Sequence, residues 1–121
     1  MSQILLVDDD ADSRVLITRL LERAGHQVHC ATSASDGIGF AMQGHPDLVI
    51  MDYRLVSMDG AEALSLLRRM DFQGRMVLIS AVTDREALDE IGHTACDAFF
   101  RKPLGRDFAA RIDALLAETA S

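Results

Sequence analysis

Three aspartates directly follow two short apolar segments of this 121-residue chain. Gln3–Val7 leads into Asp8 and Asp9, and the apolar stretch after Pro46 ends at Asp52. Carboxylates held about 5 Å apart repel one another by roughly 3 kcal/mol per pair at an effective dielectric constant of about 20. A hard divalent cation relieves this repulsion, and an open acid set with room for water and a phosphate oxygen suits Mg2+ better than Ca2+. The three aspartates are therefore predicted to bind Mg2+ if the fold brings them together.

A hydroxyl and an amine occur near the ends of two further apolar segments. Ser80 ends the segment Met76–Ser80, and Lys102 lies just past the segment Asp97–Phe100. Lys102 is the single lysine among 12 cationic side chains. An ammonium group acts as a compact point charge, whereas a guanidinium imposes a planar fork. This pattern indicates a site that requires lysine in a chain that otherwise uses arginine.

Simpler roles are open for some of these acids. Asp8–Asp10 could be a solvated acidic cap that is stabilised by the dipole of the following helix. Asp52 could merely cap the loop that follows it. Asp10 or Asp12 is expected to do no more than cap a helix.

The segments that must position these residues alternate between two patterns. Short apolar runs bounded by turn residues are typical of strands that are buried on both faces of a parallel sheet. Amphipathic segments with short connections follow each run, which predicts an α/β fold with right-handed crossovers. The carboxyl ends of the strands then share one rim, where ligands bind in such folds. The predicted strands are Gln3–Val7, Gln27–Ala31, the run from Asp47 to Asp52, Met76–Ser80 and Asp97–Phe100.

Five amphipathic helices are expected between and after these strands. Gly25 is placed to end the first helix, and Ser33 with Asp36 is placed to cap the second. The residues expected to face the core are, helix by helix, Leu16, Leu20, Leu21 and Ala24; Ala34, Ile38, Ala41 and Met42; Ala63, Leu64, Leu67 and Met70; Ala87, Leu88 and Ile91; and Phe108, Ile112, Leu115 and Leu116.

Composition limits the class of protein. The chain is 49% hydrophobic and 26% charged, which is typical of one globular domain. No apolar run approaches the roughly 20 residues of a membrane span, and the N-terminus lacks the pattern of a signal peptide. We therefore expect a soluble, cytoplasmic protein. The net charge of −7 opposes non-specific binding to nucleic acid.

The cysteines and histidines lack the spacing of a metal site. Cys30 and Cys96 fall in separate apolar segments and are expected to be buried free thiols. Solvated side chains are the expectation for the four histidines, which are His26, His29, His45 and His93.

Five short motifs, taken together, resemble the receiver domain of two-component response regulators. They occur in the family's order and at compatible spacings over essentially the whole chain. The motifs are V-D-D at Val7–Asp9, the apolar run into Asp52, M-D-G at Met58–Gly60, I-S-A at Ile79–Ala81 and F-F-R-K-P at Phe99–Pro103.

This resemblance implies a fold and a domain organisation. The fold would be a flavodoxin-like, doubly wound, five-stranded parallel sheet in the order 2-1-3-4-5, flanked by five helices. That order would place Cys30 and Cys96 on opposite edge strands, too far apart for a disulfide. Residues 1–121 would form a single receiver domain with no effector domain. The family also has a cis peptide bond at the position of Lys102–Pro103.

The resemblance also implies the chemistry. Asp52 would accept a phosphoryl group from a phosphohistidine on a sensor histidine kinase or phosphotransfer protein. The chain would promote only its own phosphorylation and dephosphorylation, as a signalling domain rather than a turnover enzyme. By position, Mg2+ would be held by Asp9, Asp52 and the backbone carbonyl of Arg54, with Asp8 acting through water, and phosphoryl oxygens would be bound by Ser80, the N–H of Ala81 and Lys102.

The family's switch and output surface can be placed in the same way. Ser80 would move toward the phosphoryl group, and Phe99 would rotate into the space that it leaves, although Phe99 could equally be a plain core residue. A downstream protein would bind the face formed by the fourth helix, fifth strand and fifth helix. The chain departs from the family at Val56, where proline is common, and this should loosen the loop into the third helix.

Two rival functions fit part of the pattern. The first is an aspartate-nucleophile phosphatase of the haloacid dehalogenase type, whose opening motif is D-x-D-x-[TV]. Asp8 and Asp10 begin this motif, but Asp12 stands at its last position and no later acidic pair completes the metal site. The second is a pseudo-receiver that signals without phosphate.

Overall fold

One parallel sheet organises the chain in the computed structural model, which describes residues 2–56, 58–81 and 96–118. Its strands lie in the order β2-β1-β3-β4-β5, as predicted. They are β1 (Gln3–Val7), β2 (Gln27–Ala31), β3 (Leu48–Asp52), β4 (Arg75–Ala81) and β5 (Ala98–Lys102). The fifth strand had been expected to end at Phe100, but its pairing continues through Ser80 with Arg101 and Ala81 with Lys102. Lys102 therefore lies on the last rung of the sheet.

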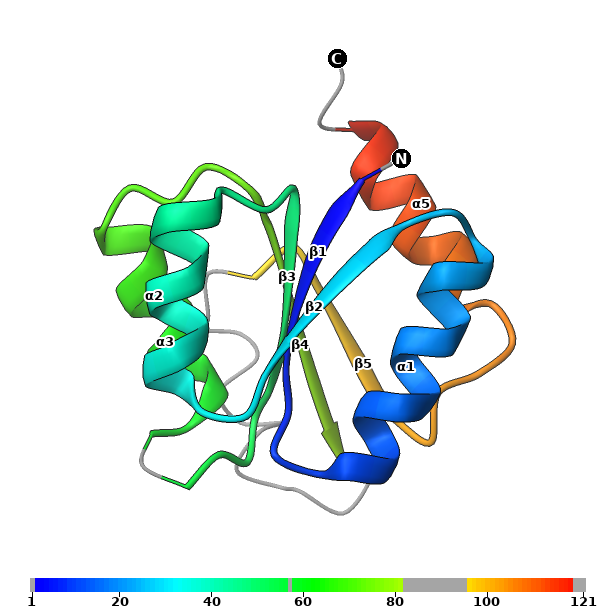
Figure 1. The fold of residues 1–121 in the computed structure, drawn as a ribbon, viewed down its shortest axis with the longest axis horizontal. Helices are drawn as coiled ribbons and strands as arrows, with labels where there is room; N and C mark the ends of the chain where they lie inside the picture. The colour runs from blue at the N-terminus through cyan, green and yellow to red at the C-terminus, as the bar shows by residue number, and fades with distance from the viewer. Residues whose placement is uncertain (1, 57, 82–95, 119–121) are drawn as a thin grey trace.

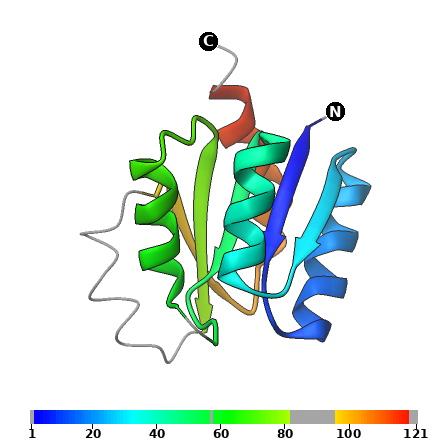
Figure 2. The same ribbon diagram turned by 60° about the vertical axis from the view of Figure 1, so that its left-hand side comes forward.

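Helices cover both faces of this sheet (Figures 1 and 2). The helix α1 (Ala11–Arg23) lies with α5 (Phe108–Glu118) on one face, and α2 (Ala34–Gly44) lies with α3 (Gly60–Arg69) on the other. These are the four helices in the described part of the chain. The predicted helix containing Ala87, Leu88 and Ile91 lies outside the described residues. None of the four is both long enough and apolar enough to span a membrane.

The central strands are buried along almost their whole length. This burial is why β1, β3 and β4 are continuous apolar runs rather than alternating ones. Their successive side chains enter two separate cores, because side chains alternate across a strand. The core beneath α2 and α3 includes Leu5, Val49, Met51, Leu64 and Leu78, and the core beneath α1 and α5 includes Leu6, Ile17, Ile50, Ile79 and Phe108.

The predicted inner faces of two helices were partly wrong. In α1 the buried residues are Ile17 and Leu21, whereas Leu16 is 52% exposed and Ala24 is the exposed C-cap. The real face is rotated toward Ile17, since this residue belongs to the same buried core as Ile4 and Leu6. Met70 was expected to point inward, but it is the C-cap of α3 and is 42% exposed.

The cysteines are free, as expected, but Cys30 is not buried. It lies on the edge strand β2, where the Cys30 Sγ is 3.4 Å from the hydroxyl of Thr18. Cys96 is partly buried, and this burial raises the pKa of its thiol.

The expectation of solvated histidines was wrong for His26. Its side chain is only 10% exposed, and its Nε2 lies 2.5 Å from Asp113 Oδ1 on α5. The contact joins the turn after α1 to α5. Sequence periodicity does not predict contacts between such distant segments.

Candidate functional site

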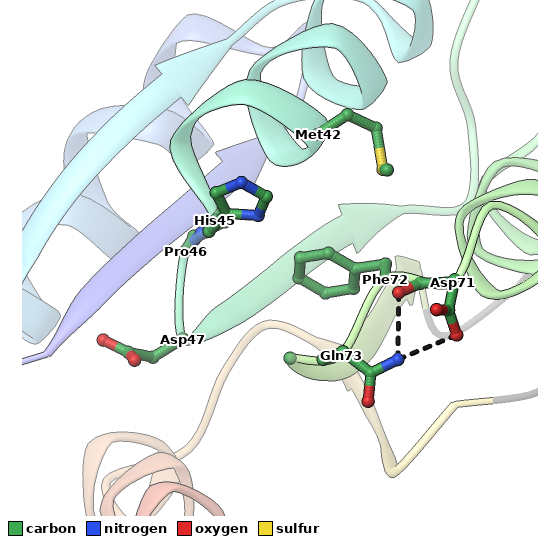
Figure 3. A pocket seen from close by; sticks show the side chains of 8 residues that line it. Met42, His45, Pro46, Asp47, Asp71, Phe72 and Gln73 are labelled. Carbon is green, nitrogen blue, oxygen red and sulfur yellow. Dashed lines mark hydrogen bonds between the residues drawn. The ribbon is translucent and has the colours of Figure 1, made fainter.

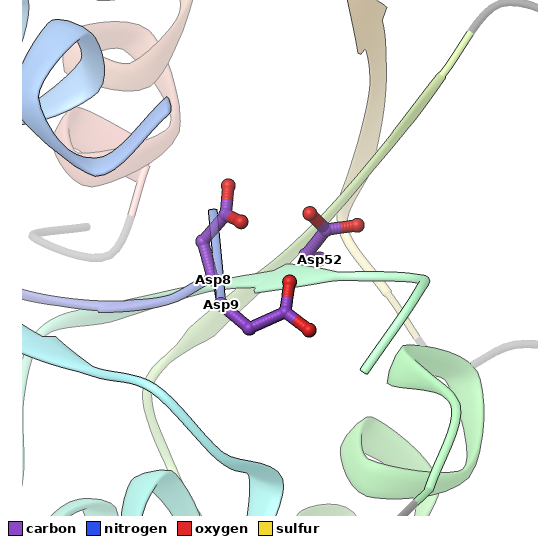
Figure 4. A group of neighbouring side chains, drawn as sticks. All are labelled: Asp8, Asp9 and Asp52. Atoms are coloured by element: carbon purple, nitrogen blue, oxygen red, sulfur yellow. The ribbon is translucent and has the colours of Figure 1, made fainter. Parts of the chain in front are cut away.

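Two neighbouring strand ends bring the three aspartates together. Asp8 and Asp9 directly follow β1, Asp52 is the last residue of β3, and β1 pairs with β3 up to Val7 opposite Met51. One carboxylate oxygen from each aspartate lies within 4.8 Å of the others (Figure 4). Asp8 and Asp52 are buried, whereas Asp9 is exposed. The cluster is thus open to solvent on the side of Asp9.

Lys102 reaches this cluster from the end of β5. Its ammonium donates to Asp52 Oδ2 at 2.8 Å and to Asp8 Oδ2 at 3.0 Å. A third hydrogen bond, 3.2 Å long, goes to the hydroxyl of Ser13 on α1. Lys102 therefore partly neutralises two buried carboxylates that come from different strands.

The charge on Asp52 is nevertheless disfavoured. Burial raises the pKa of Asp52 to about 6, and the negative charge of Asp8 adds to this rise. Hydrogen bonds from Lys102 and from the backbone N–H of Arg54, 3.0 Å from Asp52 Oδ1, act in the opposite direction. Burial would lower the pKa of Lys102, but its bonds to Asp52 and Asp8 outweigh this effect and raise it. The carboxylates thus hold Lys102 in its charged form, and the site still lacks enough positive charge to stabilise Asp52 fully.

The start of α1 supports the cluster. Asp10 is the N-cap of this helix and accepts a hydrogen bond from the backbone N–H of Ser13 at 3.2 Å, as expected for a capping residue. The hydroxyl of Ser13 also donates to Asp10 at 2.7 Å, and these bonds lower the pKa of Asp10. Arg14 donates to the backbone carbonyl of Asp8 at 2.8 Å.

Ser13 and Arg14 are the contributors to the site that sequence reasoning missed. The only signal for Ser13 was its position three residues after the capping Asp10, and that spacing predicts a cap contact rather than a contact with Lys102. Arg14 carried no comparable signal.

Gly60 shapes the other side of the site. Its N–H donates to the carbonyl of Tyr53 at 2.8 Å, which brings the start of α3 against the end of β3. A Cβ at this position would lie 2.3 Å from the backbone carbonyl oxygen of Asp52. The glycine of the M-D-G motif is therefore required because the backbone of Asp52 leaves no space for a side chain.

The remaining predicted site residues lie around this rim. Ser80 is fully buried near the end of β4, one residue beyond Ile79, which pairs with Asp52. Ala81 is the exposed end of that strand. Phe99 on β5 is partly buried and packs against the core beneath α2 and α3.

Two further predictions concern backbone near the rim. Val56, in the loop after β3, is 91% exposed and contributes nothing to the core. The Lys102–Pro103 peptide bond is cis, as the resemblance implied.

The donor set fits Mg2+. The ligand atoms offered by Asp8, Asp9 and Asp52 are all carboxylate oxygens, which hard cations prefer, and a cation would offset the repulsion that raises the pKa of Asp52. Mg2+ usually keeps several waters, which the solvent-exposed Asp9 side permits. An acidic site of this kind, with an ammonium at its edge, is suited to binding a metal ion and an incoming phosphoryl group together.

Two of the cavities among the described residues lie at opposite rims of the sheet. A groove of about 320 Å³ lies between α1 and the segment after β5, directly beside Lys102; it is lined by Ser13, Leu16, Ile17, Lys102, Pro103 and Leu104 and is called the α1 groove below. A second cavity, of about 400 Å³, lies at the opposite rim, where Asp47 and Gly74 precede β3 and β4 (Figure 3). Of these two cavities, the α1 groove includes Lys102, which bonds to the acidic cluster, so it belongs to the candidate site.

Known proteins resemble this chain in sequence and fold. A family model of the response regulator receiver domain matches residues 4–112. The transcriptional regulatory protein AfsQ1 of Streptomyces coelicolor is 34% identical over 117 residues, covering 96% of this chain and 52% of that protein. Protein PilH of Pseudomonas aeruginosa is 30% identical over 120 residues, covering 97% of this chain and 99% of PilH. The chain thus spans about half the length of the first relative and nearly all of the second.

The fold is also found in solved structures. A CheY-like response regulator receiver domain protein from Methanospirillum hungatei has a TM-score of 0.87 at 24% identity, with 99% of this chain and 97% of that chain covered. At this level of identity the likeness concerns the fold.

Proposed function

Because the chain belongs to the family of response regulator receiver domains, we propose that it accepts a phosphoryl group on Asp52 in a Mg2+-dependent reaction. The donor is a phosphohistidine on a sensor histidine kinase or a phosphotransfer protein. Phosphorylation then changes the proteins to which the chain binds. Receiver domains are signalling modules, so the chemistry of this chain is the gain and loss of its own phosphoryl group.

The observation that supports this proposal most is the meeting of Asp8, Asp52 and Lys102. Lys102 is 94 residues from Asp8 and 50 from Asp52 in sequence, yet it donates a hydrogen bond to both. Burying two like charges beside one ammonium costs stability, and such costs are typical of sites where the charges have a function. Metal-dependent phosphoryl transfer is such a function.

In the proposed reaction Asp52 is the nucleophile. One of its carboxylate oxygens forms a bond to phosphorus while the P–N bond of the phosphohistidine breaks, and the donor's imidazole nitrogen keeps the electron pair. Lys102, which already donates a hydrogen bond to Asp52, would donate to a phosphoryl oxygen once the group has been transferred. Ser80 and the N–H of Ala81, at the neighbouring strand end, donate to other phosphoryl oxygens.

The metal ligands are assigned by position in the family. Asp9, Asp52 and the backbone carbonyl of Arg54 would hold Mg2+, and Asp8 would act through a bound water. When bound, Mg2+ supplies the positive charge that screens these acids from the incoming anion and neutralises charge on the phosphoryl oxygens.

The proposed switch starts at Ser80 and ends at a protein-binding face. Leu78 pairs with Phe99, and Ser80 pairs with Arg101, so Ser80 and Phe99 belong to the same face of the sheet. A movement of Ser80 toward the phosphoryl group would free space on that face for Phe99. The target would bind β5, α5 and the predicted fourth helix, which lies outside the described residues.

Intact-mass measurement tests the proposal. The purified chain is incubated with acetyl phosphate, with and without Mg2+, and the gain of one phosphoryl group is expected only with Mg2+. The Asp52→Asn variant should gain none. Asp12→Asn is the matched control, because Asp12 is an exposed acid in the first turn of α1 outside the cluster. Absence of the gain in the wild type, or its persistence in Asp52→Asn, would remove the proposal.

The same variants distinguish the two rivals. Turnover of a small phosphomonoester that survives Asp52→Asn but not Asp8→Asn would indicate the phosphatase of the haloacid dehalogenase type. A chain that binds its partner but gains no phosphoryl group would be a pseudo-receiver.

A further inference from the structure

The ammonium of Lys102 is held by three acceptors from three different elements. Two of them, Asp8 Oδ2 at 3.0 Å and Asp52 Oδ2 at 2.8 Å, belong to the acidic cluster. The third is the hydroxyl of Ser13 on α1, at 3.2 Å. An ammonium has three N–H donors and no acceptor, so these three bonds use its full capacity and set its direction.

Ser13 is oriented to accept this bond. Its hydroxyl proton is directed to Asp10 Oδ2, 2.7 Å away, which leaves oxygen lone pairs available to Lys102. Asp10 is in turn tied to the cluster, because its backbone N–H donates to Asp8 Oδ1 at 2.9 Å. Asp8, Asp10, Ser13 and Lys102 therefore form a closed ring of hydrogen bonds that begins and ends at the acidic cluster.

From this ring we infer that Ser13 is a positioning residue for Lys102 in the phosphoryl-transfer reaction. The inference rests on the proposed function. Metal and phosphoryl groups would compete for the carboxylate oxygens that Lys102 contacts in the structure, whereas the Ser13 hydroxyl lies outside the acidic cluster. Ser13 thus keeps the ammonium at the rim while its other two bonds are exchanged.

The substitution Ser13→Ala isolates the hydroxyl. The backbone N–H of residue 13 still donates to the capping Asp10, so the helix keeps its cap. Ser13→Thr restores a hydroxyl at the same place. Ser35→Ala is the control, since Ser35 is an exposed residue in the first turn of α2 and is not one of the three acceptors of Lys102.

Because Lys102 is the single lysine of the chain, its ε-methylene signals in NMR spectra are unambiguous. In the wild type and in Ser13→Thr we expect restricted motion and two inequivalent ε protons. In Ser13→Ala the two protons should average, and the rate of phosphorylation by acetyl phosphate with Mg2+ should fall roughly 3- to 10-fold, as for loss of one hydrogen bond of ordinary strength. Ser35→Ala should change neither quantity.

The two readouts separate this inference from the proposed function. Unchanged Lys102 signals and an unchanged rate in Ser13→Ala would overturn the role of Ser13 while leaving Asp52 as the acceptor. A slower rate with unchanged Lys102 signals would also overturn it, since the effect would then not pass through Lys102. A wild-type chain that gains no phosphoryl group would overturn both proposals.

Discussion

At the scale of single residues, the site is defined by an imbalance of charge. Asp52 is buried next to Asp8, and one ammonium serves both. Burial, with the negative charge of Asp8 added to it, raises the pKa of Asp52 to about 6 despite the hydrogen bond from Lys102. The imbalance leaves the site ready to attract a cation, and it also has a cost in stability that can be measured.

The first prediction concerns stability against pH in the absence of metal. In the unfolded chain Asp52 loses its proton near pH 3.8, whereas in the folded protein it does so near pH 6. The unfolded state therefore binds fewer protons between these values, and the contribution of Asp52 to stability is lost as pH rises through about 6. In EDTA, urea unfolding should show this loss in the wild type. The free energy of unfolding of Asp52→Asn should not show this loss, and near pH 7 it should be higher than that of the wild type.

Mg2+ should reverse this destabilisation, because it binds the folded site and not the unfolded chain. Identical pH profiles for the wild type and Asp52→Asn in EDTA would contradict the prediction.

The second prediction concerns the identity of the single lysine. Lys102→Arg keeps the charge, but a planar guanidinium cannot direct its donors to three acceptors that converge on one point. We expect phosphorylation by acetyl phosphate to slow roughly 100-fold, the lower end of the effect seen when a positioned donor is lost. The phosphorylation-dependent change in the NMR signals of Phe99 should be lost as well. Arg106→Lys, a swap at an exposed position after β5, is the control and should behave as the wild type.

At the scale of elements, the site depends on the close approach of the N-terminus of α3 to the C-terminal end of β3. The N-cap Asp59 accepts from the N–H of Glu62 at 2.8 Å, and Gly60 bonds back to Tyr53. These contacts fix the direction of the loop that follows Asp52. The loop after Asp52 is thus positioned by the close approach of the Gly60 backbone to the backbone of Asp52 and Tyr53, rather than by a side chain.

The third prediction follows from that approach. Gly60→Ala would place a Cβ 2.3 Å from the Asp52 carbonyl oxygen, and a backbone atom cannot move as a side chain can. We expect a loss of about 1–3 kcal/mol in the free energy of unfolding, as for other overpacked sites. Phosphorylation of Asp52 should slow in parallel, because the backbone that carries the nucleophile must shift.

Gly39→Ala is the matched control for this change. A Cβ at Gly39 has nothing within 4 Å, and the residue lies inside α2, so alanine should stabilise the fold by about 0.5–1 kcal/mol. Equal unfolding midpoints in urea for the two variants would show that the approach of α3 to β3 is not tight.

At the scale of the whole molecule, α1 serves both the core and the surface. Ile17 and Leu21 hold it on the sheet, while Val15 and Leu16 are 51% and 52% exposed. Leu16 lines the α1 groove together with Lys102, so this apolar surface is continuous with the candidate site. If Asp52 accepts a phosphoryl group from another protein, as proposed, an exposed apolar groove beside Lys102 favours a contact with that donor.

The fourth prediction separates the groove from the chemistry. Leu16→Glu should slow phosphoryl transfer from a histidine kinase that phosphorylates the wild type, by roughly 10- to 100-fold, since burying a leucine side chain at the contact contributes about 1.5–3 kcal/mol. The rate with acetyl phosphate should not change, because this small donor does not need the groove. Met70→Glu is the control, as Met70 is 42% exposed at the end of α3. A Leu16→Glu variant that slows with both donors would place the defect in the site itself.

Local patterns in the sequence determined much of the fold and the type of site. Continuous apolar runs predict buried parallel strands, and each run that ends at Asp8, Asp52 or Ser80 places a polar group at the shared rim, since all strands of a parallel sheet end on the same side. The residue types predicted Mg2+ as a suitable cation, provided that the fold brings the three aspartates together. The strand predictions needed only neighbours in sequence.

The tertiary structure alone decided distances, burial and long-range partners. The bond between Lys102 and Ser13 joins residues 89 positions apart, and the raised pKa of Asp52 reflects burial that no local pattern encodes. Periodicity also could not tell Ile17, which packs in the core, from Leu16, which lines a groove, because both are apolar residues on one side of α1. The physical reason is the same in each case: local sequence sets the conformation of a segment, but packing against distant segments sets the environment of each side chain.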